Sequence, residues 1–224
     1  MNIPAKLLIS AAVLALAACS SGPKPADWQL EAKTASERAV AAYMEGNTRV
    51  EAVEFARALS EVASTGRVEL IARVELLRCA SRAASLVLEP CAGFERLRAD
   101  APPAERAYAD YLAGKLQPQH AALLPASQRA AASGDAAAVK AMADPLSQLV
   151  AVAVLFQRGQ ASPAVLQQAV DTASSQGWRR PLLAWLGVQA QVAEKAGDAE
   201  EAARLRRRMA LAEPARPGAA GPKP

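Results

Sequence analysis

The sequence predicts an all-α protein, on three observations. Alanine, the strongest helix former, is the commonest residue, and aromatic residues make up only 4% of the chain. Runs rich in Val, Ile and Thr, which favour strands, are nearly absent. Glycines recur at intervals of 18 to 27 residues, which leaves room for one helix and a short turn each time. These expected turn glycines are Gly46, Gly66, Gly93, Gly114, Gly134, Gly159, Gly177 and Gly197.

Helix-start signals follow several of these glycines. Asn or Asp comes directly after the glycine at Gly46-Asn47, Gly134-Asp135 and Gly197-Asp198, where its side chain can accept from the free amides of the next helix. Thr48-x-x-Glu51 and Asp198-x-x-Glu201 have capping-box spacing, and Asp144 and Ser162 each precede a proline. The expected helices cover 28–45, 48–64, 67–89, 93–99, 103–114, 118–132, 135–142, 145–158, 163–176, 181–196 and 198–212.

Short connections between these helices predict antiparallel helical hairpins. The apolar stretch Leu149–Phe156 is expected to be a central buried helix rather than a strand, because an Asp-Pro start precedes it. Pairs of helices make units of about 40 residues, the scale of stacked helical repeats.

In residues 183–214, Gly197 and Asp198 lie at a turn between two expected helices, Ala202 at a small position of the second helix, and Pro214 closes the unit. This pattern resembles a tetratricopeptide repeat. The first helix departs from the pattern, with Ala190 at the usual glycine and Ala193 at the usual tyrosine. The resemblance implies hairpins stacked as a tetratricopeptide-like solenoid, and an irregular helical bundle is the alternative.

The N-terminus has one early positive charge and a short apolar run. Lys6 precedes the apolar run Leu7–Ala18, which is too short to span a bilayer as a permanent helix. The run ends in Leu-Ala-Ala-Cys, similar to a lipobox, which implies cleavage before Cys19 and lipid on that cysteine. The alternative is an ordinary secretory signal with an accidental cysteine. The residue that follows Cys19 is Ser20 rather than Asp. By resemblance to enterobacterial lipoproteins, this implies sorting to the periplasmic face of the outer membrane.

These signals divide the chain into four parts. They are a signal peptide (1–18), a lipidated tether (19–26), an α-helical repeat-like domain (27–213) and a disordered Pro/Gly/Ala tail (214–224). Fully extended, the tether from Cys19 to Pro25 reaches at most roughly 25 Å, so the domain is expected close to its membrane.

Cys79 and Cys91 remain besides the anchor. Because the lipobox implies an oxidising compartment, this pair predicts a disulfide, with two separate buried thiols as the alternative. Closing a loop of this size stabilises a fold by about 3 kcal/mol. Metal binding is not expected, because His120 is the only histidine.

No catalytic residue or cofactor is assigned from the sequence. It contains no HExxH, no GxSxG and no phosphate-binding glycine loop. The 26 basic and 22 acidic residues are interspersed, which does not suggest a nucleic-acid partner. Carboxylates from distant positions could still converge, so an enzyme with a dispersed carboxylate site stays open.

Two surfaces are predicted to bind partners. Arg204, Arg206, Arg207 and Arg208 form a basic cluster for anionic headgroups or an acidic partner, with a solvated end-cap face as the alternative. By the tetratricopeptide resemblance, helix 181–196 lines a concave surface. There the polar residues Gln189, Gln191 and Glu194 sit among Ala190, Ala193 and Ala196, whose small side chains leave room for a partner.

Tyr108 and Tyr111 lie on one helix face. They could form an aromatic patch, but we expect them to pack between helices.

Taken together, the features of the sequence predict an outer-membrane lipoprotein that acts as a scaffold for a periplasmic protein or peptide in envelope assembly. The alternatives are a peptidoglycan-related enzyme of the cell envelope and a passive lipoprotein.

Overall fold

The computed structural model describes residues 24–213. The expected signal peptide, Cys19, most of the tether and the tail 214–224 lie outside the described residues. The elements are α2 (Asp27–Glu45), α3 (Thr48–Ala63), α4 (Val68–Ala84), α5 (Ala92–Glu95), α6 (Pro103–Leu112), the 3₁₀ helix η2 (Pro118–Leu123), α7 (Ala126–Ala132), α8 (Ala136–Lys140), α9 (Pro145–Gln157), α10 (Pro163–Ser175), α11 (Arg179–Lys195) and α12 (Ala199–Ala212). Within residues 24–213 there is no strand, and the predicted all-α class is confirmed. None of these helices is long and apolar enough to cross a bilayer.

Capping residues begin the helices largely as the sequence predicts. Asn47 accepts from the Val50 amide at the start of α3, and Asp198 accepts from the Glu201 amide at the start of α12. Asp135, Asp144 and Ser162 cap α8, α9 and α10 in the same way. Every expected turn glycine except Gly93 has a positive φ. Thr48 and Glu51 do not form the predicted capping box, because Asn47 is the cap and Glu51 bonds to arginine instead.

Two predicted helices were too long. Helix 67–89 ends at Ala84, because Leu86 adopts φ 60° and the Val87 amide folds back to the Arg82 carbonyl. Because a left-handed conformation costs an L-residue about 1–2 kcal/mol, glycine is the usual residue at such a helix end. No glycine lies there in this sequence, so the end of α4 could not be predicted. Helix 118–132 is two elements, η2 and α7, because Pro125 interrupts the hydrogen-bond ladder.

The bounds of three further helices also differ from those predicted. The expected helix 93–99 is the single turn α5 (Ala92–Glu95), and it contains Gly93, which is therefore not a turn glycine. Helix 135–142 shortens to α8, whereas helix 181–196 begins two residues earlier than expected, at Arg179.

Helix α9 is the centre of the core. As predicted for Leu149–Phe156, it is buried almost all round: every residue from Gln148 to Leu155 is buried. It packs on α4 and α10. Trp185 of α11 is fully buried beside it, its ring and that of Phe156 form a T-shaped pair, and its Nε1 donates to the Ala84 carbonyl at 3.0 Å. A smaller core around Phe55 joins α2 and α3 to the first turns of α4.

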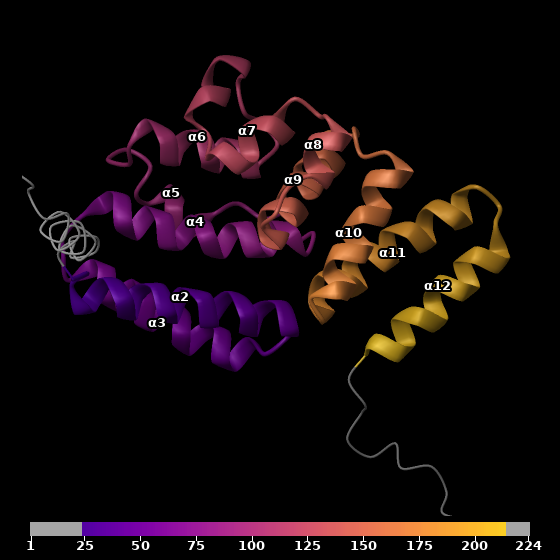
Figure 1. Cartoon of the computed structure of the whole chain (residues 1–224), viewed down its shortest axis with the longest axis horizontal. Coiled ribbons are helices and arrows are strands. Elements are labelled where there is room, and N and C mark those ends of the chain that lie inside the picture. The colour runs from indigo at the N-terminus through magenta and orange to yellow at the C-terminus, as the bar shows by residue number, and fades with distance from the viewer. Residues whose placement is uncertain (1–23, 214–224) are drawn as a thin grey trace, which may run out of the picture.

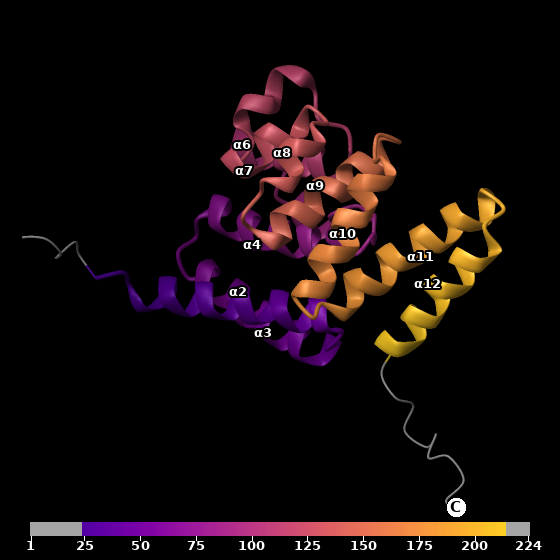
Figure 2. The same cartoon turned by 45° about the vertical axis from the view of Figure 1, so that its right-hand side comes forward.

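The arrangement is an irregular bundle rather than a one-directional stack. The α2–α3 hairpin lies on one side of α4, with α6, α7 and α8 on the other (Figures 1 and 2). The α11–α12 hairpin lies at the opposite end of the molecule (Figure 1). However, α11 also packs on α2, and α4 packs on α9, so helices distant in sequence touch directly. In a solenoid each repeat would contact only its neighbours.

Candidate partner-binding site

A largely apolar groove runs between α4, α6 and the end of η2. Its volume is about 410 Å³. This is within the range of about 300–1,000 Å³ typical of ligand pockets. Leu123, Leu124 and Pro125, which lie where the expected helix 118–132 divides into η2 and α7, form one wall. The lining residues are Arg73, Leu76, Leu77, Ala104, Glu105, Tyr108, Leu123, Leu124 and Pro125.

A tyrosine pair supports the wall formed by α6. The rings of Tyr108 and Tyr111 stack with centroids 6.1 Å apart. Tyr111 is fully buried and donates from its hydroxyl to Gln128 Oε1 at 2.7 Å, while Gln128 Nε2 donates to the Ser147 carbonyl at 3.0 Å. Burial raises the pKa of Tyr108 well above its ordinary value, and the charge of Asp144 raises it further, so this groove residue stays neutral. The pair therefore packs between helices, as expected, and Tyr108 also faces the groove.

One ion pair marks the polar edge of the groove. Arg73 Nε donates to Glu105 Oε1 at 2.8 Å. The Glu105 side chain is only 6% exposed, whereas that of Arg73 is 64% exposed. Arg73 thus balances the charge of the buried Glu105 carboxylate. The exposed guanidinium has further N–H groups that can donate to a ligand at the mouth of the groove. Such a site offers apolar surface bordered by a cation.

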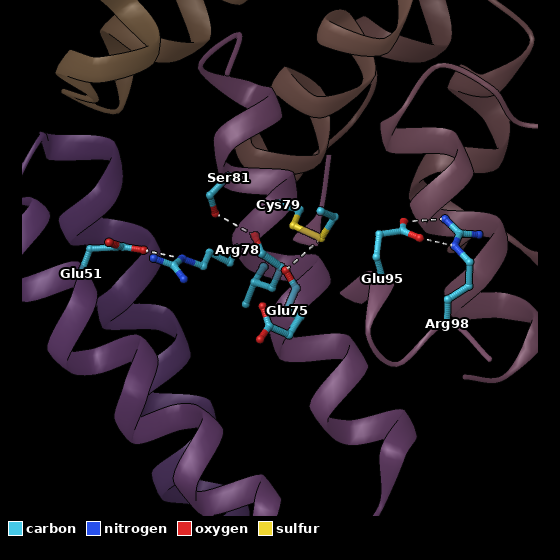
Figure 3. The surroundings of a disulfide bond; sticks show 9 residues. Glu51, Glu75, Arg78, Cys79, Ser81, Glu95 and Arg98 are labelled. Atoms are coloured by element: carbon cyan, nitrogen blue, oxygen red, sulfur yellow. Dashed lines mark hydrogen bonds and ion pairs between the residues drawn. A yellow bond between two sulfur atoms is a disulfide. The ribbon is translucent and has the colours of Figure 1, made fainter. Parts of the chain in front are cut away.

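The predicted disulfide is present: Cys79 and Cys91 are bonded, with Cα atoms 5.8 Å apart (Figure 3). It forms part of a second hollow of about 550 Å³, between the chain that follows α4 and helix α6. At its edge Arg98 donates to both carboxylate oxygens of Glu95, at 2.7 and 2.8 Å, and to Asp110 at 2.9 Å. Hydrogen bonds from Arg98 lower the pKa of Glu95.

Arginine also neutralises the most deeply buried carboxylate near the disulfide. Glu51 of α3 is 3% exposed and accepts from Arg78 Nε at 2.9 Å (Figure 3). Arg82 approaches the same oxygen at 3.7 Å, and the Arg78 guanidinium lies over the Phe55 ring. Because removal of one partner leaves the other charge unpaired, this cluster fastens α3 to α4.

Most of the residues predicted on α11 and α12 have polar partners within the fold. Glu194 forms an ion pair with Arg206, and Arg204 pairs with Glu201 at 2.6 Å. Gln189 Nε2 donates to Gln167 Oε1 at 2.9 Å, and Arg208 approaches Ser174 at 3.4 Å. Gln191 and Arg207 are exposed.

The expected room beside the alanines of α11 is absent. Ala190 and Ala193 are buried, and only Ala196 is exposed. A Cβ on Gly187 would lie 3.8 Å from Met209 of α12, so this glycine faces the packing between the two helices of the hairpin. Whether the remaining polar residues bind a partner stays a prediction.

Sequence reasoning missed most of the groove. It singled out Tyr108, but Arg73, Glu105 and Leu123 carry no motif and meet only through the packing of α4, α6 and η2. Among residues 24–213, no group of three or more His, Cys, Asp or Glu side chains is placed to hold a metal ion. No protein-family model, curated protein or solved structure matches the chain.

Proposed function

We propose that the protein is a lipid-anchored envelope scaffold that binds an apolar segment of a periplasmic protein or peptide in the groove between α4, α6 and η2. The observation that carries this proposal is the groove itself. Leu77 and Leu123 leave apolar surface open to solvent there, beside Tyr108. Grooves of this kind bind peptide segments through a few apolar anchor side chains.

The polar edge suits binding rather than proton transfer. Glu105 accepts from Arg73 and is nearly inaccessible. Arg73 keeps its terminal nitrogens at the mouth, where they can donate to a carbonyl or carboxylate of the bound segment. The exposed residues Gln191 and Arg207 of the α11–α12 hairpin would serve as a secondary contact.

The anchor part of the proposal rests on the lipobox and on Ser20. We propose that the chain is cut before Cys19, lipidated there and held at the periplasmic face of the outer membrane. Helix α2 begins at Asp27. A tether of that length keeps the domain within roughly 30 Å of the membrane surface.

The alternative, a peptidoglycan-related enzyme, has one candidate location. Glu75 and Glu89 line the same hollow of about 190 Å³ beside the disulfide. If these carboxylates act as an acid and base, the purified protein should release muropeptides from isolated cell walls, and Glu75→Gln should abolish the release. The scaffold proposal expects no release by either protein.

Photo-crosslinking in living cells tests the scaffold proposal. A photoreactive amino acid at Leu123, in the groove, should give a discrete adduct with one envelope protein, identified by mass spectrometry. The same amino acid at Leu30, an exposed leucine of α2 outside the groove, should not. Equal adducts from both positions would contradict the proposed location.

A further inference from the structure

Glu75 is a buried carboxyl without an ion-pair partner among the described residues. It is 9% exposed, whereas the other buried carboxylates, Glu51 and Glu105, are paired with arginines. Burial raises the pKa of Glu75, and the positive charges of Arg78 and Arg96 offset this only in part. In Figure 3 no dashed line reaches its carboxyl group. The closed fold therefore shifts Glu75 toward its neutral form relative to a carboxyl in water.

The backbone of α5 covers this carboxyl. A Cβ added to Gly93 would lie 1.9 Å from Oε2 of Glu75. Glycine at this position lets the backbone pass this close, and any larger residue would displace the Glu75 carboxyl.

The disulfide holds that cover in place. Residues 88–90 are exposed, and the backbone carbonyls of Pro90 and Cys91 accept only from N–H groups of α5 among the described hydrogen bonds. The Pro90 carbonyl accepts from Ala92 N–H and the Cys91 carbonyl from Glu95 N–H, both at 2.9 Å. The Cys79–Cys91 bond is thus the tie that fastens this loop to α4. Phe94, fully buried, anchors the far end.

The sulfur atoms are within reach of a reagent. Both cysteines are half-buried and line the hollow of about 550 Å³, and Cys79 also lines the hollow of about 190 Å³. Val87, Leu88 and Glu89 form part of the wall of the larger hollow. A change in the loop would therefore change the shape of that hollow.

We propose that the Cys79–Cys91 disulfide is a redox latch that keeps the loop 86–93 closed over the Glu75 carboxyl, and that a dithiol reductant opens it. The reductant supplies two electrons and two protons. The Cys79–Cys91 bond breaks to give two thiols, and the reductant becomes a disulfide. The freed loop moves away, Glu75 gains water, which favours its ionised form, and the larger hollow loses the wall that residues 87–89 provide.

Opening should also depend on pH through Glu75. The charged groups around it are Arg78 and Arg82 on α4, Glu89 on the loop and Arg96 beyond α5. Glu89 is exposed. As pH rises, ionisation of Glu75 disfavours the cover and so favours the open, reduced form.

Hydrogen–deuterium exchange of the purified protein, with and without dithiothreitol, tests the latch. Reduction should speed early exchange in peptides from Leu86–Glu95 by at least about tenfold, with α9 and α11 unchanged. The double variant Cys79→Ser/Cys91→Ser should match the reduced protein without reductant. Unchanged exchange in Leu86–Glu95, or an equal increase in α9 and α11, would overturn the proposal.

The Glu75→Gln variant tests the contribution of the Glu75 carboxyl to opening separately from that of the disulfide. The reduced variant should lack the extra opening that the reduced natural protein gains as pH rises, because glutamine stays neutral. Both proteins share the intrinsic pH dependence of amide exchange, so their ratio reports Glu75 alone. A ratio that does not change with pH would show that Glu75 takes no part in the latch.

Discussion

Arg180 donates from Nε to the backbone carbonyl of Tyr43 at 2.8 Å, across 137 residues of sequence. Its guanidinium also lies 4.2 Å from the centroid of the Tyr43 ring, and its Nη2 donates to Thr48 Oγ1 at 3.0 Å. These contacts join the start of α11 to the turn between α2 and α3. They connect the first helical hairpin, α2–α3, to the last, α11–α12. A one-directional stack of repeats would leave these two hairpins apart.

Arg180→Ala should destabilise the fold by about 2 kcal/mol, because it removes a charge-assisted hydrogen bond and a cation–π contact. For a domain of this size, the melting temperature should fall by roughly 4–8 °C. Thermal unfolding followed by circular dichroism measures it.

Arg179→Ala is the matched control. Arg179 is the adjacent arginine, is exposed, and has no polar partner among the described residues. Its replacement should change stability by less than about 0.5 kcal/mol. Equal losses in the two variants would mean that Arg180 does not join the ends of the bundle.

Local chemistry explains which parts of this fold could be predicted. Asn47 and Asp198 act on amides within three residues of themselves, so the sequence alone locates the helix starts. The apolar run Leu149–Phe156 of α9 likewise predicts its own burial. By contrast, Leu86 ends α4 in a conformation that leucine rarely adopts, and no local signal marks it.

The groove and the arginine contacts depend on distant parts of the chain. Arg73 and Glu105 are separated by 32 residues, and Arg180 and Tyr43 by 137. No periodicity relates such positions. The disulfide was predictable because only two cysteines remain in the expected domain, whereas the carboxyl of Glu75 beneath Gly93 was not.

The stability of the folded protein should depend on pH through Glu75. In the unfolded chain this carboxyl ionises near its ordinary value of 4.5, whereas burial raises its pKa in the folded state. Between these two values the folded state holds a proton that the unfolded state has released, so stability falls as pH rises. Glu75→Gln removes this loss.

Urea unfolding of both proteins at about pH 4 and about pH 8 measures the difference. The variant should gain stability relative to the natural protein at the higher pH. Glu200→Gln, on the exposed side of α12, is the control and should show no such trend. A stability difference for Glu75→Gln that is the same at both values would refute the role of burial.

Cys19→Ala should abolish labelling by a radioactive or clickable fatty acid and leave an uncleaved precursor, because the proposed anchor needs that thiol. Membrane fractionation and gel mobility measure both effects. Ser20→Ala is a suitable control that keeps the cysteine. Normal acylation of the Cys19→Ala protein would rule out the lipobox.

The central claim is that the groove between α4, α6 and η2 binds a partner segment. The most direct measurement is a titration of the partner captured at Leu123, using Leu123→Asp and Leu30→Asp proteins of equal thermal stability. The two leucines are 40% and 50% exposed, so each variant adds one charge at a similarly open position. The proposal predicts that Leu123→Asp weakens binding at least about tenfold, or about 1.4 kcal/mol, while Leu30→Asp leaves it unchanged. Equal affinity of the two variants would contradict it.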